Sequence, residues 1–331
     1  MWVLFKKSSD LIQMNDNPSN NHPDSQTLVN QIVIEYMRDQ KRKRRWNWFK
    51  RALIAVIVLL IAYRLYHYGD EDKTVRLKPH VGLIDLNGTI FDSEAAGAEN
   101  FAKSMDSAYQ SGGLKAIIIR INSPGGSPVQ ADYMYNTLQY YRQKYPDIKT
   151  YAVCVDMCAS AAYYVAAGAD EIYANQSSIV GSIGVLYNGF GFVDTMQKLG
   201  VTRRLQTAGK NKGFMDPFSP QTPLQVQLLQ TMLDGIHQQF IDKVKAGRGD
   251  RLKVDDDTFS GLFWTGEQAK ERGLIDGFAS SGQIVREKMQ LEKVIDYTYK
   301  QSVLERFSKN LGTALASQLP LALGLKPGVI E

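Results

Sequence analysis

The pattern that most constrains the fold is an alternation of apolar runs and helical stretches that begins near His80. Such spacing is typical of right-handed βαβ units, so it predicts an α/β domain with a largely parallel sheet. The expected elements are a strand at 81–90, a helix at 98–113, a strand from Leu114, a helix at 128–145, a strand at 149–156 and a helix at 159–167. A long helix is expected from Thr222 to about Ala246, and a shorter one ends at Gly273.

A different kind of segment precedes this domain. The uncharged run Ala52–Tyr63 follows a basic cluster, Lys41–Arg51, and is bordered by Trp and Tyr residues. The run is shorter than the roughly 20 residues that span a bilayer, which leaves a buried core helix as an alternative. Flanking Lys and Arg side chains can snorkel to the headgroups, and the aromatic rings suit the interfaces. We therefore predict one transmembrane helix at 46–68. Because no signal-peptidase cleavage site follows the apolar run, we predict that it is not a cleaved leader.

Orientation and the remaining domain boundaries follow from charge and composition. The net charge of +5 is concentrated in the basic cluster, which the positive-inside rule keeps cytoplasmic. This predicts a single-pass protein of a bacterial inner membrane, with the catalytic domain on the periplasmic or outer side. The predicted parts are a mostly disordered cytoplasmic segment at 1–45, a linker at 69–79, the main domain at 80–300 and an amphipathic tail at 301–331. Nucleic-acid binding by the basic cluster is disfavoured because the cluster adjoins the apolar run.

Two cysteines, Cys154 and Cys158, are the only ones in the chain. Along a straight strand their Cα atoms would lie about 13 Å apart, too far for a disulfide, so we expect buried free thiols. Histidines are few and no C-x-x-C occurs, so no metal site is predicted.

The segment Ile121–Pro128, "INSPGGSP", places two glycines between a buried strand and a helix. Such a turn can aim backbone N–H groups at an anion, either a phosphate or an oxyanion. It lacks the Gly-Lys-Ser/Thr ending of a P-loop and does not match G-x-G-x-x-G, which disfavours phosphate. A tight turn that merely requires glycine remains an alternative.

Ser160 lies at the end of the next strand-to-helix connection, where it could be a nucleophile or only a helix cap. A Ser-His-Asp triad is poorly supported, because the four histidines lie in the N-terminal part, the linker region or the middle of a helix: His22, His67, His80 and His237. A serine–lysine dyad needs a lysine that burial keeps neutral. Lys210 and Lys212 both lie in a glycine-flanked loop, and nothing local distinguishes them.

Five motifs occur together in a characteristic order: "INSPGGSP", "CASAAYYVAAGADEIYA", "GSIGV", "AGKNKGFMDPFSP" and "WTGEQAKERGLIDGF". In this order and spacing the chain resembles the signal peptide peptidase A family of membrane-anchored serine peptidases, over roughly residues 78–300. The resemblance implies a Clp-protease and crotonase-like fold and a serine endopeptidase without a cofactor. Its expected substrates are remnant signal peptides or other apolar membrane-associated peptides.

By motif position, the resemblance implies that Ser160 is the nucleophile, Lys212 the general base and Ser182 a residue that orients the lysine. It implies oxyanion donors in the Gly125–Gly126 turn and at Ala161. The family usually has glycine at that last position, and a left-handed Ala161 would cost roughly 1 kcal/mol or more. The resemblance also implies a homo-oligomeric ring in which neighbouring protomers share the dyad.

Two other classes of function compete with the peptidase. A crotonase-like acyl-CoA enzyme would use the same fold and a similar oxyanion hole, but an outer-side domain would not meet cytosolic CoA. An inactive oligomeric scaffold would be indicated by loss of Ser160 or Lys212, and the chain has both.

Overall fold

In the described part of the chain, residues 25–300 of the computed structural model, eight strands form one sheet. Its central strand β2 (Leu114–Ser123) pairs in parallel with β1 (His80–Asn87) and β3 (Lys149–Ala159). The remaining strands are β4 (Glu171–Ala174), β5 (Ile179–Gly181), β6 (Phe263–Thr265), β7 (Gly277–Phe278) and β8 (Val294–Asp296). Within this sheet only the pairing of β5 with β6 is antiparallel. The predicted α/β class with a largely parallel sheet is confirmed.

Helices connect these strands. They are α2 (Ala98–Tyr109), α3 (Pro128–Lys144), α4 (Ala161–Ala166), α5 (Val193–Lys198), α6 (Pro223–Arg248), α7 (Gly266–Glu271) and α8 (Ser281–Gln283), with a 3₁₀ turn at Gly249–Arg251 and a π-helical turn at Ile284–Lys288. Their bounds agree closely with the helices expected at 98–113, 128–145, 159–167 and 222–246. Two begin with Pro at their first position behind a capping Ser127 or Thr222, a common helix start.

Helix α1 (Ser25–Arg76) includes the basic cluster, the apolar run and most of the predicted linker. The chain divides into two units after Glu71, near the end of this helix. Among the helices of the described residues, none contains a stretch long and apolar enough to cross a membrane. The boundaries predicted at 45, 68 and 79 stay predictions, and the amphipathic tail at 301–331 lies outside the described residues.

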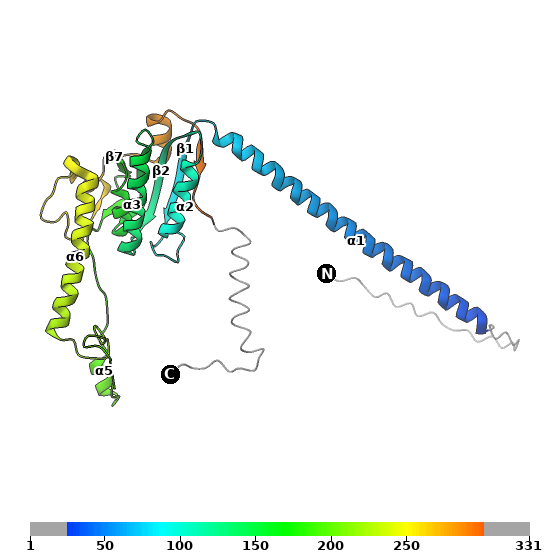
Figure 1. Cartoon of the computed structure of the whole chain (residues 1–331), viewed down its shortest axis with the longest axis horizontal. Coiled ribbons are helices and arrows are strands. Elements are labelled where there is room, and N and C mark those ends of the chain that lie inside the picture. Colours follow the sequence, from blue (N-terminus) through cyan, green and yellow to red (C-terminus); the bar gives the residue numbers. More distant parts are fainter. Residues whose placement is uncertain (1–24, 301–331) are drawn as a thin grey trace, which may run out of the picture. The chain divides into compact units, whose positions relative to one another are not determined.

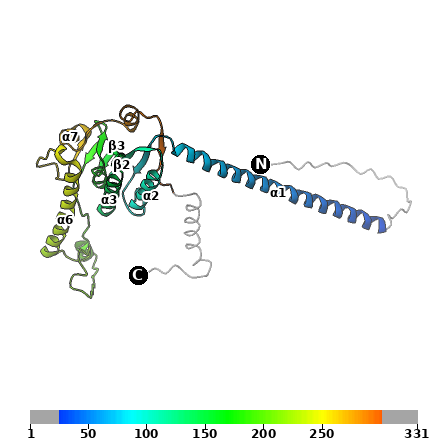
Figure 2. The ribbon, with the colours of Figure 1, turned by 45° about the horizontal axis from the view of Figure 1, so that its top comes forward.

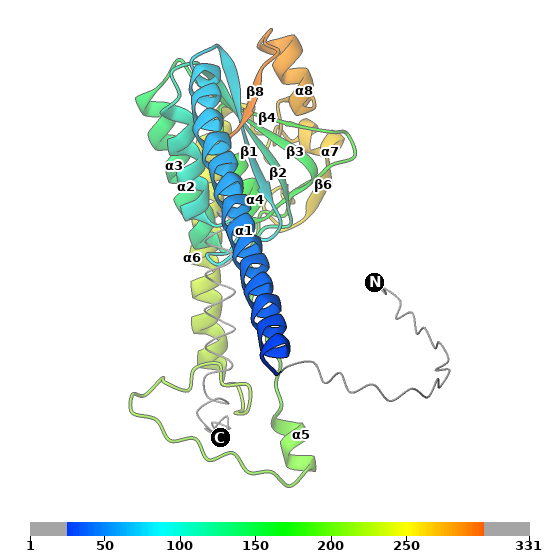
Figure 3. The ribbon, with the colours of Figure 1, turned by 90° about the vertical axis from the view of Figure 1, so that its right-hand side faces the viewer.

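Both faces of the sheet are covered, which explains why β2 is an almost continuous apolar run. Ile117, Ile119 and Ile121 face the larger core, to which α2, α3 and α4 contribute, while Ala116 and Ile118 face a smaller core closed by Ile284 and Val285. Figures 2 and 3 show α2 and α3 together on one side of β1 and β2, and Figure 3 shows α8 on the other. Burial of each isoleucine contributes roughly 1.5–3 kcal/mol.

Strand β3 changes partners along its length. Its first half pairs with β4 and its last residues, Met157–Ala159, pair with β5. Between these halves β3 bulges, because Cys154 and Cys158 oppose Ile121 and Ser123, only two positions apart on β2. The two thiols are free and buried, as expected, but they lie closer than on a straight strand. Burial and the neighbouring Cys154 thiol raise the pKa of Cys158.

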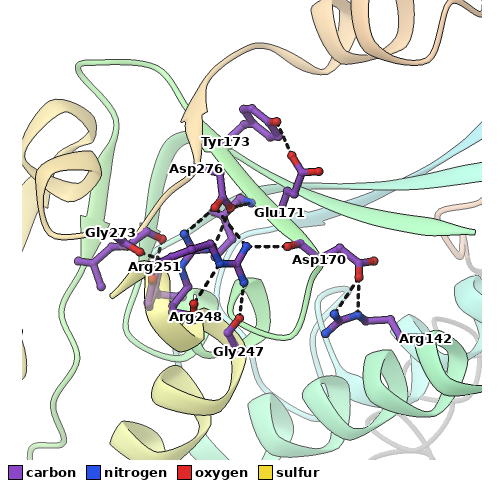
Figure 4. A network of polar contacts seen from close by, with 12 residues as sticks. Arg142, Asp170, Glu171, Tyr173, Gly247, Arg248, Arg251, Gly273 and Asp276 are labelled. Carbon is purple, nitrogen blue, oxygen red and sulfur yellow. Dashed lines mark hydrogen bonds and ion pairs between the residues drawn. The ribbon is translucent and has the colours of Figure 1, made fainter. Parts of the chain in front are cut away.

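Helix α6 is fixed to the sheet at its C-terminal end by a buried ion pair (Figure 4). The Arg248 guanidinium, 1% exposed, donates to both carboxylate oxygens of Asp276 at 2.8 and 2.9 Å and to the Gly273 carbonyl. Asp276 also accepts from the backbone N–H of Ile172 at 2.7 Å. Burial alone would raise the pKa of Asp276, but the bonds from Arg248 and Ile172 outweigh it, so the pKa is lowered.

The opposite end of α6 lies away from the sheet. Together with α5 and the connecting segments it forms a projection, residues 185–232, which we call the arm; Figures 1 and 3 show α5 and the start of α6 far from the strands. Helix α5 has no buried residue, and Leu186, Phe190 and Leu199 are 80%, 75% and 74% exposed. The arm therefore exposes apolar side chains that no other part of residues 25–300 covers.

Candidate active site

Ser160 occupies a sharp turn between β3 and α4. Its backbone has φ 55° and ψ −127°, a conformation that costs a residue with a side chain about 1–3 kcal/mol. The turn is held on both sides: the Ser160 N–H donates to the Gly181 carbonyl at 2.8 Å, and the Ser160 carbonyl accepts from Tyr164 at 3.0 Å. A strained strand–turn–helix junction of this kind presents a serine hydroxyl outward, as nucleophilic serines require.

The hydroxyl lies at a cavity of about 500 Å³, which we call the Ser160 cavity. Ser160, Ala161, Gly126 and Ser182 all line it. Its remaining walls are mixed. Apolar and aromatic side chains come from Pro128, Tyr164, Val185, Leu186, Ile236 and Phe240, and the other lining residues are Gly184, His237, Ser260 and Gly261. Four of the six residues predicted for the site are thus brought together from three separate segments.

A larger cavity, about 660 Å³, lies beside Val153–Asp156 and is bordered by Arg120 and Gln176. It does not include Ser160 or either glycine of the Gly125–Gly126 turn. We assign the site by the strained serine and its donors rather than by volume.

The Gly125–Gly126 turn packs directly against the serine. A Cβ on Gly125 would lie 2.7 Å from Ser160 Cβ, and one on Gly126 would lie 2.3 Å from the Ile90 carbonyl oxygen. The two residues have φ of 105° and 153°, so both space and backbone conformation require glycine. The turn therefore requires glycine, as the tight-turn alternative expects, and its predicted role in binding an oxyanion stays a prediction.

Two backbone N–H groups beside the serine are available as donors. Within residues 25–300 no acceptor is found for the N–H of Gly126 or of Ala161, and both residues line the Ser160 cavity. Ala161 is the first residue of α4, where helix N–H groups lack intrahelical partners. The Gly125 N–H differs, because it donates to Ser123 Oγ at 3.1 Å. Ala161 is not left-handed, so the cost considered for that case does not arise: the positive φ belongs to Ser160 instead.

Ser182 lies in a second strained turn, with φ 52°. Its N–H donates to the Leu262 carbonyl at 2.8 Å, and its carbonyl accepts from Gly184 at 3.0 Å. Ser182 lines the same cavity as Ser160. Its predicted role in orienting Lys212 stays a prediction.

The two candidate bases lie elsewhere. Lys210 and Lys212 are both exposed, in turns on the arm between α5 and α6, and neither lines the Ser160 cavity. The backbone N–H of Lys212 donates to the Gly209 carbonyl at 3.1 Å. A single copy of the chain therefore does not bring Lys212 to Ser160.

Among the cavity residues that sequence reasoning did not assign to the site is a titratable one, His237 of α6. Its Nε2 lies 3.0 Å from the Ile183 carbonyl oxygen, one residue beyond Ser182. The available signal was spacing: His237 shares the inward face of α6 with Phe240 and Val244, which are buried.

Among the described residues, no group of three or more His, Cys, Asp or Glu side chains could hold a metal ion.

Comparison with known proteins adds evidence independent of this geometry. The model of "Peptidase family S49" matches residues 142–295, which include Ser160, Ser182 and Lys212, and that of "Clp protease" matches residues 84–180. The second match and the mostly parallel sheet fit a Clp-protease-like fold.

Three relatives illustrate the range of similarity. A Na(+)/H(+) antiporter NhaA of Brucella abortus is 35% identical over 280 residues, 85% of this chain but 36% of that protein. The putative signal peptide peptidase SppA of Enterococcus faecium is 26% identical over 75% of this chain and 73% of its own length. Protease 4 of Haemophilus influenzae is 28% identical over 69% of this chain and 36% of its own length. The chain thus spans about a third of the Brucella relative, whose name describes a much longer protein.

Proposed function

Because the chain belongs to peptidase family S49, as a member of the signal peptide peptidase A type, we propose that it is a serine endopeptidase in which Ser160 is the nucleophile and Lys212 the general base. The observation that carries the proposal is the strained Ser160 turn beside two free N–H groups, those of Gly126 and Ala161. Neither the strain nor the free donors has an evident structural use.

The residues perform the reaction in two steps. Ser160 Oγ attacks the scissile carbonyl while the side-chain amine of Lys212 takes the hydroxyl proton, and the N–H groups of Gly126 and Ala161 stabilise the oxyanion. The lysine ammonium then protonates the leaving amine as the peptide bond breaks. Water, activated by the same lysine, hydrolyses the acyl-enzyme and restores Ser160. Ser182 orients the lysine.

Lys212 reaches Ser160 from a neighbouring copy of the chain. The proposal is supported by the position of Lys212 on the arm and by the exposed apolar side chains there, such as Phe190 and Leu199. A head-to-tail contact repeated around a rotation axis closes into a ring and gives every Ser160 one lysine.

The substrates are apolar peptides, including remnant signal peptides. The supporting observation is the apolar wall of the Ser160 cavity, formed in part by Val185, Leu186 and Phe240. Such a wall favours extended peptides with apolar side chains beside the scissile bond.

The protein works at a membrane. The apolar run Ala52–Tyr63 lies on α1 with exposed large side chains, directly after the basic cluster. The uncharged run alone is shorter than a standard span, but the flanking Lys50 and Arg51 side chains can snorkel to the headgroups and extend it. In our proposal this region anchors the chain in a bacterial inner membrane, with the N-terminus cytoplasmic and the peptidase unit on the outer side.

The proposal is tested with the full-length chain in detergent and a fluorogenic apolar peptide. Ser160→Ala and Lys212→Ala should abolish hydrolysis, while Lys210→Ala, the matched control on the same loop, should retain it. Equal hydrolysis by the parent and Ser160→Ala would show that Ser160 is not the nucleophile.

Mixing the two inactive variants tests the shared dyad. If neighbouring copies share it, co-assembled Ser160→Ala and Lys212→Ala chains should regain roughly a quarter of the parent activity, since that fraction of sites pairs an intact serine with an intact lysine. A dyad within one chain would regain none.

A further inference from the structure

We propose that His237 is a positioning residue of this active site: its imidazole holds the turn Gly181–Gly184 and thereby fixes Ser160 and Ser182. This inference rests on the proposed peptidase function. His237 does not have to touch the substrate, because it acts through the backbone of the turn.

The turn Gly181–Gly184 joins the two strained serines. Gly181 and Ser182 both have positive φ, 107° and 52°, so the turn needs external bonds to hold its shape. At its start the Gly181 carbonyl accepts from the Ser160 N–H, and the Ser182 N–H donates to Leu262. A displacement of the turn therefore moves the nucleophile and Ser182 together.

The other end of the turn depends on His237. Ile183 is fully buried, and a buried carbonyl without a donor is costly, about 1–3 kcal/mol. Among the residues that the structure describes, the His237 ring is the one donor to this carbonyl, at 3.0 Å. Because a carbonyl oxygen only accepts, Nε2 carries the hydrogen. Both the neutral and the protonated imidazole can supply it.

Helix α6 gives the imidazole a firm base. Phe240 and Val244, one and two turns further along the same face, are buried in the larger core. Beyond them the Arg248–Asp276 ion pair fixes the end of the helix. The packed C-terminal half of α6 thus holds His237 in place relative to the sheet, and the His237 ring in turn contacts the turn that carries Ser182.

Two substitutions separate the N–H donor from the bulk of the ring. His237→Gln keeps an N–H near the position of Nε2, whereas His237→Phe keeps the planar ring and removes the donor; His237→Leu is a second donor-free variant. Gln239→Leu, exposed on the opposite side of α6, is the matched control. The full-length chain is assayed for kcat and KM on the apolar peptide and for covalent labelling of Ser160 by a fluorophosphonate.

We expect His237→Phe to lower kcat and the labelling rate by about tenfold to a hundredfold, because a shift of roughly 1 Å in a catalytic group has effects of this size. KM should change little, and His237→Gln should restore most of the activity. Unchanged kcat in both donor-free variants would overturn the inference. A His237→Gln protein as inactive as His237→Phe would also overturn the inference, because it would indicate that the imidazole itself takes part in the reaction.

Amide hydrogen exchange of residues 181–184 tests the role of His237 independently of peptidase activity. Exchange in the turn should quicken in His237→Phe and stay near the parent rate in His237→Gln, whether or not any peptide is cleaved. If parent and Ser160→Ala hydrolyse equally, the peptidase proposal fails, while exchange still decides the role of His237. Unaltered exchange in the donor-free variants would contradict it.

Discussion

Gly125 and Ser160 are in direct contact across two different strand-to-helix connections: a Cβ on Gly125 would stand 2.7 Å from Ser160 Cβ, 2.8 Å from the Ala159 carbonyl oxygen and 3.0 Å from the Ala161 nitrogen. The turn after β2 and the turn after β3 thus share one small volume. Because the backbone of Gly125 occupies the space beside the serine, the N–H of the next residue, Gly126, can lie on the cavity.

Gly125→Ala should therefore reduce activity strongly. The added methyl group has to displace Ser160 or the backbone next to it, which should lower kcat about a hundredfold. Gly88→Ala is the control, because Gly88 also has positive φ, 84°, but a Cβ there meets nothing within 4 Å. Both variants should lose stability in urea unfolding, and only Gly125→Ala should lose activity. Full activity of Gly125→Ala would contradict the close packing of Gly125 against Ser160.

Ser160→Gly should be inactive yet more stable than the parent. Glycine adopts φ 55° without the strain that Ser160 carries, so the gain should be about 1 kcal/mol. Ser160→Ala, equally inactive, keeps the strain and is the control. Thermal unfolding of the three proteins checks this, and a Gly variant no more stable than Ala would show that the turn stores no strain.

Leu199→Glu should dissociate the assembly and abolish hydrolysis together. Leu199 is 74% exposed on the arm, so a charge there costs one copy little but disrupts an apolar contact between copies. Gln197→Glu adds the same charge at a neighbouring exposed position and should be neutral. Sedimentation velocity and the peptide assay are the measurements. If the Leu199→Glu protein keeps the size and activity of the parent assembly, Leu199 of the arm does not contribute to the contact between copies.

Arg248→Met should destabilise the peptidase unit by about 3–5 kcal/mol, since it leaves the half-buried Asp276 without its main partner. Urea unfolding at pH 7 measures the loss, and Lys253→Met, at an exposed position, serves as control. A loss under 1 kcal/mol would mean that Arg251, 3.1 Å from Asp276, suffices alone.

Asp276→Asn should alter the pH dependence of stability. Because the folded pKa of Asp276 lies below the unfolded value of about 3.9, its contribution is complete above that value and disappears as the pH falls through the folded pKa. The stability difference between parent and Asp276→Asn should thus be largest near neutral pH and shrink at acidic pH. A difference independent of pH would contradict the lowered pKa.

Much of the local structure follows from the sequence because its causes are local. Apolar runs, Pro at helix starts and the glycines after β2 predict α2, α3, β2 and the turn at Gly125–Gly126 within a few residues. The position of Ser160 at the start of α4 is predicted in the same way. Family resemblance adds the roles of Ser160, Lys212 and Ser182, which stay proposals.

Other features depend on contacts between distant segments. The bulge in β3 between Cys154 and Cys158 lies where β3 exchanges β4 for β5 as its partner. The positive φ lies at Ser160 rather than Ala161, in a turn whose Ser160 N–H donates to the Gly181 carbonyl of a different segment. The place of His237 on the cavity depends on how α6 packs, which its mid-helix position does not reveal.

The sequence by itself determined the alternation of strands and helices from β1 to α4, the long helix α6, the glycine turn and the candidate serine, because backbone propensity and apolar periodicity act within a few residues. Only the tertiary structure decided which N–H groups remain free beside Ser160, that His237 supports the turn of Ser182, and that Lys212 lies on an arm apart from the serine in one copy. Those relationships join residues tens of positions apart, and they are set by packing of the whole sheet and its helices rather than by any local preference.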